Sequence, residues 1–414
     1  MNKSTKSTDL HGACVNGKKT IPALVLCLLV TGAVHADQDQ GIKFSGSGFL
    51  TLAAGKVLSG SGGDPAAVRE KYGYQSPSFI ADYAQGGVYE SNGWNFGPDS
   101  KLGLQGEAKF NDRFSATGQV VARGARDGKV NLEWVYGSYK LDDKITLQAG
   151  RKRLPLFYYS ESQDVGLSSP WVHLPPQLYG WEIVNYNGAN VLYRDQWNGW
   201  ASSLNVFAGN ETRKDDGYWK IYNGKNSVTD SRWSDIVGGE WSLSPRDWLE
   251  TRLVYIQSYT QNKVVIGNAA AGINPNADFS AKTRQKIYGF SVSADYESWV
   301  VRAEFLSINR REDYGGDRAQ LLGVGYRVGK FLPMVTYANY KQIRKPDSPN
   351  VVNGTYPIDG AEGHDTLSLS LRYDLTTSSA VKAQFDHWRD KSGLGFTPPY
   401  GSSNLLTVGY DLVF

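Results

Sequence analysis

Apolar and polar side chains alternate with a period of two along most of this 414-residue chain, and no other feature constrains its fold as strongly. The clearest segment is 365–375, where Leu367, Leu369 and Leu371 share one face and Ser368 lies on the other. Such alternation predicts a β-strand with one apolar and one polar face. The sequence predicts sixteen strands, at 42–54, 101–110, 114–123, 130–141, 144–152, 188–195, 200–209, 235–243, 248–259, 285–296, 299–309, 319–328, 331–341, 365–375, 381–386 and 406–414.

The connections between these segments alternate between short and long. The short connections are at 111–113, 142–143, 244–247, 297–298, 329–330 and 376–378. The long ones, mostly rich in Gly, Asp, Asn and Ser, are at 58–100, 154–187, 210–234, 260–284, 342–364 and 391–403, while 124–129 is short and 310–318 intermediate. A membrane barrel places tight turns on one side and long loops on the other, and a soluble sandwich follows no such rule. The connections therefore favour a membrane barrel.

Aromatic residues stand at the ends of the predicted strands. Phe110 and Phe114 flank one short turn, and Trp241 and Trp248 flank another. Amphipathic rings prefer the headgroup level, so this placement predicts an interfacial girdle and argues against a soluble lectin or jelly roll. Because no backbone edge can stay unpaired in hydrocarbon, the first strand must pair with the last. The predicted fold is an all-β, antiparallel transmembrane barrel of about sixteen strands around an aqueous lumen, with long extracellular loops and short periplasmic turns.

Residues 1–36 are predicted to be a secretory signal peptide, and 37–414 a single barrel domain. Four lysines precede an apolar run at 21–30 that is too short to span a bilayer, and Val34-His35-Ala36 offers a cleavage site. A buried N-terminal helix and a lipoprotein signal at Cys27 are the alternatives. Cys27 is preceded by Val25 and Leu26, which are not the small residues that a lipoprotein site needs.

Cleavage after position 36 changes the composition that bears on function. It removes both cysteines, four of the 44 basic residues and one of the 41 acidic residues, so the mature chain is formally neutral. Without cysteine, a disulfide framework and a Cys metal site are excluded. Neutrality removes the main support for nucleic-acid binding. We therefore expect no metal, no cofactor and no nucleic-acid partner.

The last nine residues carry a resemblance to a known family. Residues 406–414 alternate apolar positions and place Tyr410 fifth from the end, Leu412 third from the end and Phe414 last, which resembles the assembly signal of bacterial outer-membrane barrels. The segments 102–107 and 149–151 are also similar to porins. Residues 42–414 thus resemble the sixteen-stranded Gram-negative porins, although the long 58–100 connection departs from compact ones. The resemblance implies an outer-membrane homotrimer that contacts lipid and lipopolysaccharide and is recognised by the barrel-assembly machinery.

In the porins that this chain resembles, the loop after the fifth strand folds into the barrel and narrows it. Here that loop is 154–187, and four prolines stiffen it. An ordinary extracellular loop with solvated acids is the alternative. The candidate constriction residues are Tyr158, Tyr159, Glu161, Asp164, Trp171 and Glu182.

Strand parity predicts which charged side chains face the lumen, because charges facing hydrocarbon cost ~2–4 kcal/mol near the midplane. The predicted basic wall residues are Arg123, Lys152, Arg194, Arg252, Arg302, Arg327, Arg372 and Lys382. The predicted acidic ones are Glu107, Glu240, Glu250, Glu304, Asp374, Asp386 and Asp411. Each of them is as well explained by a wall salt bridge. Their near balance predicts weak ion selectivity. Parity leaves Arg151 and Arg153 unplaced.

An enzymatic barrel would need Ser or paired Asp near His. His173 falls in the predicted constriction loop, His364 opens a strand and His387 falls on the lipid-facing phase. No Gly-x-Ser-x-Gly element or phosphate loop occurs in the sequence. The sequence therefore predicts a passive diffusion porin for small hydrophilic solutes and ions, not an enzyme. A substrate-selective channel for sugars or organic anions is the alternative, and a non-conducting adhesin-like barrel is a third class.

Overall fold

The structure, a computed structural model, describes residues 41–266, 277–310, 315–344, 361–393 and 400–414. All of these belong to one unit, Ala36–Phe414. The predicted signal peptide lies outside the described residues, so it stays a prediction.

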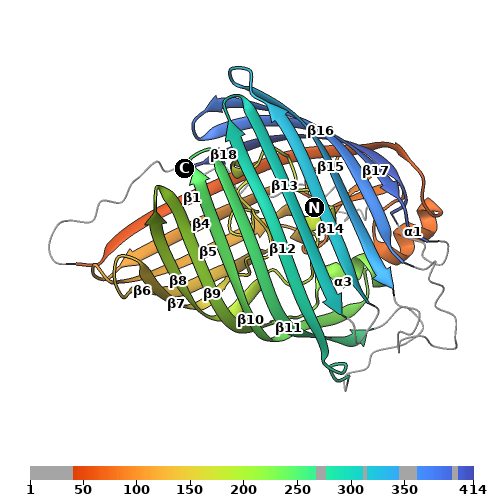
Figure 1. The fold of residues 1–414 in the computed structure, drawn as a ribbon. Helices are drawn as coiled ribbons and strands as arrows, with labels where there is room; N and C mark the ends of the chain where they lie inside the picture. The colour runs from red at the N-terminus through yellow and green to blue at the C-terminus, as the bar shows by residue number, and fades with distance from the viewer. Residues whose placement is uncertain (1–40, 267–276, 311–314, 345–360, 394–399) are drawn as a thin grey trace, which may run out of the picture. The chain divides into compact units, whose positions relative to one another are not determined.

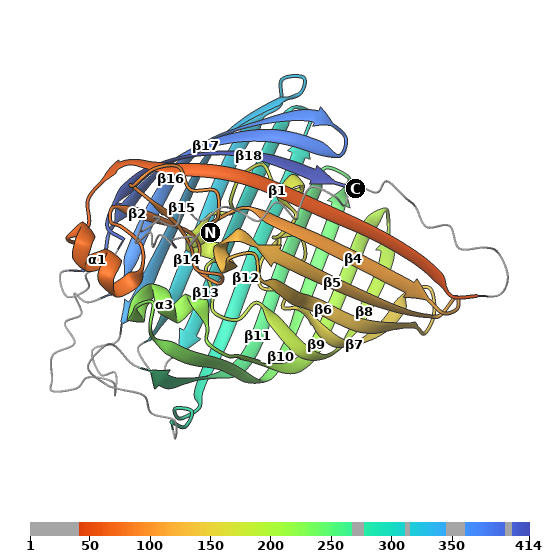
Figure 2. The ribbon, with the colours of Figure 1, turned by 180° about the vertical axis from the view of Figure 1, so that it is seen from behind.

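Sixteen antiparallel strands close into a barrel (Figures 1 and 2), which confirms the predicted fold class. The closure is made by β1 and β18, in which Thr51 pairs with Asp411. Every predicted segment is a strand. The barrel strands are β1 (Lys43–Gly60), β4 (Lys101–Lys109), β5 (Phe114–Arg123), β6 (Val130–Lys140), β7 (Ile145–Arg153), β8 (Asn185–Trp197), β9 (Trp200–Arg213), β10 (Val228–Arg246), β11 (Leu249–Ile266), β12 (Thr283–Tyr296), β13 (Trp299–Arg310), β14 (Gly315–Tyr326), β15 (Phe331–Arg344), β16 (Gly363–Thr376), β17 (Ser379–Asp390) and β18 (Ser403–Val413).

The two faces of the wall differ as the alternation predicts. On β16, Leu367 and Leu369 are exposed on the outer face, whereas Ser368 and Ser370 are buried on the inner one. An apolar outer face is what a hydrocarbon environment requires. The aromatic rings beside the short turns pair across strands, with ring centroids 4.9 Å apart for Trp248–Tyr296, 4.9 Å for Trp299–Tyr326 and 4.6 Å for Phe331–Tyr373.

A β-bulge in β6 breaks the alternation. Val120 pairs with Leu132 and Gln119 with Trp134, so Glu133 is an extra residue with no partner in the ladder. A bulge shifts the phase of the side chains that follow it. Glu133 is thereby turned into the barrel, where its side chain is buried.

The first long connection folds into the barrel on the inner side of β17 and β18. It contains α1 (Pro65–Tyr72), β2 (Ser78–Asp82) and β3 (Gly87–Glu90), and β2 and β3 form a small separate sheet. Phe79 lies 5.4 Å from Trp388 of β17, measured between ring centroids, in a cluster with Val57 and Leu405. We call residues 61–100 the first insertion.

The remaining helices are short and lie in connections. They are η2 (Gly124–Arg126), η3 (Gly166–Ser168), α2 (Pro176–Tyr179) and α3 (Gly217–Asn223). Figures 1 and 2 show α1 and α3 together at one end of the barrel. No helix in the described part of the chain has the length and apolar character needed to cross a membrane.

Candidate functional site

The connection after the fifth barrel strand crosses the lumen. It spans 154–184 and is closed at its base by a backbone hydrogen bond from Leu154 to Val184. Its far part contacts the opposite wall: the Trp171 indole donates to Thr336 on β15 at 2.8 Å, and the Val172 backbone N–H donates to Gln384 on β17 at 2.8 Å. We call residues 154–184 the inserted loop.

Apolar packing holds the inserted loop against one half of the wall. Trp171 and Leu178 are buried in a cluster with Ile256, Ile287 and Met334, which project inward from β11, β12 and β15. Such burial contributes about 25 cal/mol per Å² of apolar area removed from water. Inward-facing strand positions are otherwise mostly polar. These apolar side chains stand at such positions where the loop covers them.

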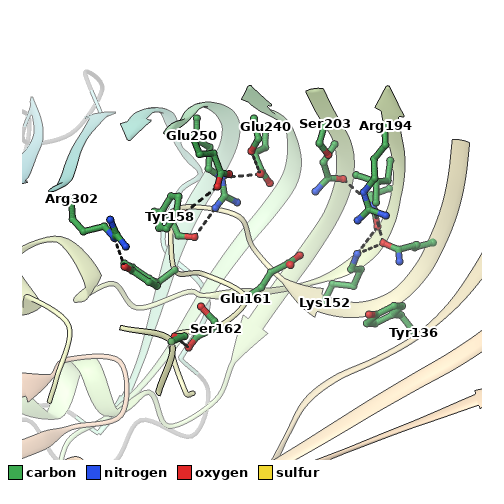
Figure 3. Close-up of a pocket in the computed structure, with 18 residues that line it drawn as sticks. Tyr136, Lys152, Tyr158, Glu161, Ser162, Arg194, Ser203, Glu240, Glu250 and Arg302 are labelled. Atoms are coloured by element: carbon green, nitrogen blue, oxygen red, sulfur yellow. Dashed lines mark hydrogen bonds and ion pairs between the residues drawn. The ribbon is translucent and has the colours of Figure 1, made fainter. Parts of the chain in front are cut away.

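A polar cavity of about 540 Å³ remains between the inserted loop and the wall from β6 to β13. Figure 3 shows its lining, with Glu161 on the loop between two groups of wall residues. A second hollow, beside the β8–β9 connection, shares Arg194, Ser203, Ser242 and Glu250 with the first. The two hollows therefore adjoin along the wall.

The β7–β8 side of the cavity is basic. The Lys152 ammonium is bonded to Gln148 and, at 3.1 Å, to Asn190, and it lies 4.7 Å from the centre of the Tyr136 ring. These partners are neutral, so Lys152 keeps its charge uncompensated. Arg194 is exposed, and its guanidinium makes no hydrogen bond to a described residue.

The facing side carries acids. The Glu161 carboxylate is exposed in the cavity and has no cation within ion-pair distance among the described residues. Glu250 on β11 accepts a hydrogen bond from the Tyr158 hydroxyl at 3.1 Å. Arg252 is instead neutralised by Glu240 at 2.8 Å. The net result is a separation of charge across the cavity, basic on β7–β8 and acidic on the loop and β11.

Tyr158 and Tyr159 also line this cavity, as Glu161 does. The Tyr159 hydroxyl accepts a hydrogen bond from Arg302 at 2.9 Å, and Arg302 also pairs with Asp295 at 2.6 Å. Three of the six predicted constriction residues thus line the cavity, although Tyr159 is itself buried.

The other three lie in the inserted loop but do not line this cavity. Asp164 is buried in ion pairs with Arg123 at 2.6 Å and Arg153 at 2.5 Å. Glu182 is buried beside Arg310 at 3.4 Å. Trp171 is fully buried between the rest of the loop and the barrel wall. Burial alone would raise the pKa of Asp164, but the neighbouring arginines and Lys101 hold it well below its usual range.

Many predicted wall charges hold the loop instead of lining open space. Arg372 donates to the carbonyls of Leu167 and Ser169, and Lys382 donates to those of Gly166 and Trp171. The remaining wall contacts follow the same principle or lie near the short-turn end: Glu304 with Tyr158 and Tyr179, Asp386 with His173, Asp411 with Lys382, Asp374 with Arg327 and Arg372, and Glu107 with Lys109.

Sequence reasoning missed several residues of this network. Glu133 forms an ion pair with Arg123 at 2.5 Å and with Arg153 at 3.1 Å, and only the bulge turns it inward. Arg151, left unplaced by parity, pairs with Glu211 at 2.8 Å. His173 contacts two carboxylates, and the only signal for it was its place in the loop.

The predicted assembly residues lie on the last strand. Tyr410 pairs with Leu52 and Leu412 with Leu50 across the β1–β18 closure, and the Phe414 backbone bonds to Gly48 in both directions. Within the described residues, no three His, Cys, Asp or Glu side chains are placed to hold a metal ion.

No protein-family model matches the sequence, and no curated protein does either. Solved structures match the fold. OmpT, an outer membrane protein of Vibrio cholerae, is 10% identical with a TM-score of 0.55, over 92% of this chain and 99% of its own. The outer membrane channel DcaP of Acinetobacter baumannii is 8% identical with a TM-score of 0.53, over 92% and 99%. An anion-selective porin from Comamonas acidovorans is 12% identical with a TM-score of 0.52, over 90% and 100%.

The chain therefore has the barrel fold of bacterial outer-membrane porins and channels. Its closed barrel and apolar outer face suit a hydrocarbon environment. At these identities the likeness concerns the fold alone.

Proposed function

We propose that this barrel is a passive diffusion channel for small hydrophilic solutes and ions. The observation that carries the proposal is the polar cavity between the inserted loop and the β6–β13 wall. A soluble core of this size would be filled with apolar side chains. Here hydroxyls, amides and uncompensated charges face open space, which suits water and hydrated solutes.

The separated charges would set the selectivity. Lys152 and Arg194 attract anions, and Glu161 and Glu250 attract cations on the facing side. Because the two sets are equal in number and opposite in sign, we expect weak ion selectivity. The cavity walls would also orient a dipolar solute during passage.

The surroundings of His173 and His387 support a channel over a hydrolase. A catalytic base needs one ring nitrogen beside a nucleophile and a carboxylate behind the other. Both ring nitrogens of His173 instead contact carboxylates, at 3.1 Å each. His387 lies exposed on the outer face, bonded to Asn404.

We further propose the partners that such a channel needs. Lipid and lipopolysaccharide would cover the apolar outer face, and the barrel-assembly machinery would recognise the last strand through Tyr410, Leu412 and Phe414. The functional form would be a homotrimer. Residues 1–36 would be removed on export.

Single-channel conductance of the refolded mature protein in a planar bilayer tests the function. Stable openings that close in three steps, with a small reversal potential under a salt gradient, would support a trimeric and weakly selective porin. A folded, inserted barrel without conductance would contradict it. Conductance block by one class of sugar or organic anion, and not by others of equal size, would favour the substrate-selective alternative.

A further inference from the structure

We infer that His173 is the positioning residue that fixes both inserted segments of the lumen to each other and to the barrel wall. The first insertion, the inserted loop and β17 each supply one member of a buried triad: Asp99, His173 and Asp386. Hydrogen bonding between neighbouring barrel strands does not connect these three elements. The imidazole ring is the point at which they meet.

The geometry is that of a bridge. His173 Nδ1 lies 3.1 Å from Asp99 Oδ2, and His173 Nε2 lies 3.1 Å from Asp386 Oδ2. All three side chains are at most 5% exposed. A neutral imidazole has one N–H, so it can donate to only one of these carboxylates. The side-chain nitrogen of Gln384 also lies 3.2 Å from His173 Nε2. The two carboxylate contacts are both favourable only when the ring carries two protons.

Further bonds fix the two carboxylates. The Tyr89 hydroxyl donates to Asp99 at 2.7 Å, and the Ser368 hydroxyl donates to Asp386 at 2.5 Å. The Phe79 ring lies 5.2 Å from the His173 ring, measured between centroids. The triad is therefore closed off from water by the first insertion itself.

Electrostatics agrees with the geometry. Burial by itself lowers the pKa of His173, but the carboxylates of Asp386 and Asp99 more than offset it and raise that pKa to about 10. Tyr89 and Lys101 are the other titratable groups near Asp99. Without the imidazolium, two carboxylates would face each other in a buried site, which is costly. The ring thus holds together segments that would otherwise repel.

The position of His173 joins the triad to the part of the inserted loop that contacts the opposite wall. Val172, the preceding residue, is bonded to Gln384, and Trp171 is bonded to Thr336 and accepts from Lys382. Loss of the His173 contacts would release this part of the loop. It would also release β2, whose Phe79 packs against the His173 ring. Its consequence for conductance depends on the proposed channel function, whereas the bridge itself does not.

The test is His173→Gln, with His387→Gln as the matched control because His387 is exposed on the outer face. Each variant is made in a Ser78→Cys background, since Ser78 on β2 is fully buried and the mature chain has no other cysteine. A membrane-impermeant maleimide reports exposure of the first insertion, and Ser61→Cys, an exposed position, is the positive control. Heat-shifted gel mobility verifies that each barrel is folded.

We expect the thiol introduced by Ser78→Cys to react at least about tenfold faster when His173→Gln is also present, the factor that corresponds to ~1.4 kcal/mol. Channel openings should become noisy, with added subconductance levels. In the control both readouts stay at the level of the Ser78→Cys background. Unchanged labelling in a folded His173→Gln barrel would overturn the inference. Faster labelling in a barrel that never conducts would leave the bridge standing and refute the channel function alone.

Two further measurements separate positioning from general destabilisation. The double variant Asp99→Asn/His173→Gln should lose little more free energy of unfolding than His173→Gln alone, because both substitutions break the same bridge. In the wild type, the ¹⁵N shifts of the His173 ring should show two protons from pH 5 to pH 8. A ring that titrates near pH 6.5 would contradict the bridge.

Discussion

Arg123 on β5 and Asp164 in the inserted loop form a two-point ion pair, with Nη2–Oδ2 at 2.6 Å and Nε–Oδ1 at 3.2 Å. Arg153 joins the same carboxylate at 2.5 Å, and Glu133 balances the second arginine. The pair therefore anchors the middle of the loop to β5, β6 and β7. It also explains why Asp164, an acid in the inserted loop, does not meet solvent.

Asp164→Asn should destabilise the barrel strongly. It leaves two buried arginines to share the single charge of Glu133, and breaking a buried pair typically costs about 3–5 kcal/mol. The measurement is the urea midpoint of the refolded barrel in detergent. Asp195→Asn is the control, because the Lys144–Asp195 pair is exposed and should contribute little. Equal midpoints for the two variants would show that the buried network does not anchor the loop.

Removing single charges from the cavity should shift ion selectivity in opposite directions. Glu161→Gln should favour anions and Lys152→Gln should favour cations, because each leaves the facing charge unopposed. One unit charge at about 8 Å in water contributes roughly 0.5 kcal/mol, so we expect about a twofold change in the permeability ratio. Reversal potentials under a KCl gradient measure this ratio. Asp112→Asn, an exposed position in the short turn between β4 and β5 and away from the cavity, should leave the ratio unchanged.

The sequence predicts those parts of the fold in which apolar and polar side chains alternate regularly. Strand residues such as Leu367 and Ser368 obey a rule of two because lipid lies on one side and the lumen on the other. All sixteen strands could be predicted for that reason. The inward orientation of Glu133 could not be predicted in this way, because a bulge adds one residue and locally shifts the alternation.

The inserted segments have no period, so their side chains could not be placed. Glu161 and Asp164 are three residues apart in the same loop, yet one faces the cavity and the other is buried. The path of the loop decides this, and that path is set by distant partners such as Lys382 and Gln384. The pairing of His173 with Asp99 and Asp386 depends on contacts between residues that are 74 and more than 200 positions apart in the sequence.

The long-loop end of the barrel, which holds Glu362, should loosen as the pH rises from about 4.5 to about 7. Burial raises the pKa of Glu362 to about 7, although the hydroxyls of Tyr400 and Tyr222 donate to its carboxylate. A carboxyl whose pKa is raised by folding holds its proton more tightly in the folded state. Stability is therefore full below its ordinary pKa of 4.5 and falls as the pH rises towards 7, by up to about 3 kcal/mol.

Limited proteolysis at pH 5.5 and pH 8 measures this effect. We expect the loops of the wild type to be cleaved faster at the higher pH, relative to an unfolded substrate cleaved under the same conditions. Glu362→Gln, which cannot ionise, should remove the difference. A pH dependence that persists in Glu362→Gln would assign the loosening to another group.

The orientation of the wall makes a last prediction about depth in the membrane. Leu369 lies at the centre of β16 and Leu375 near its short-turn end, and both are exposed on the outer face. Arginine on the lipid face costs about 2–4 kcal/mol at the midplane and about 0–1 near the interface. Leu369→Arg should therefore destabilise the barrel in lipid vesicles far more than Leu375→Arg does. The free energy of unfolding is measured by tryptophan fluorescence during urea titration. Equal costs at the two positions would mean that the apolar belt is not centred on the middle of β16, and the barrel would then sit at a different height in the membrane.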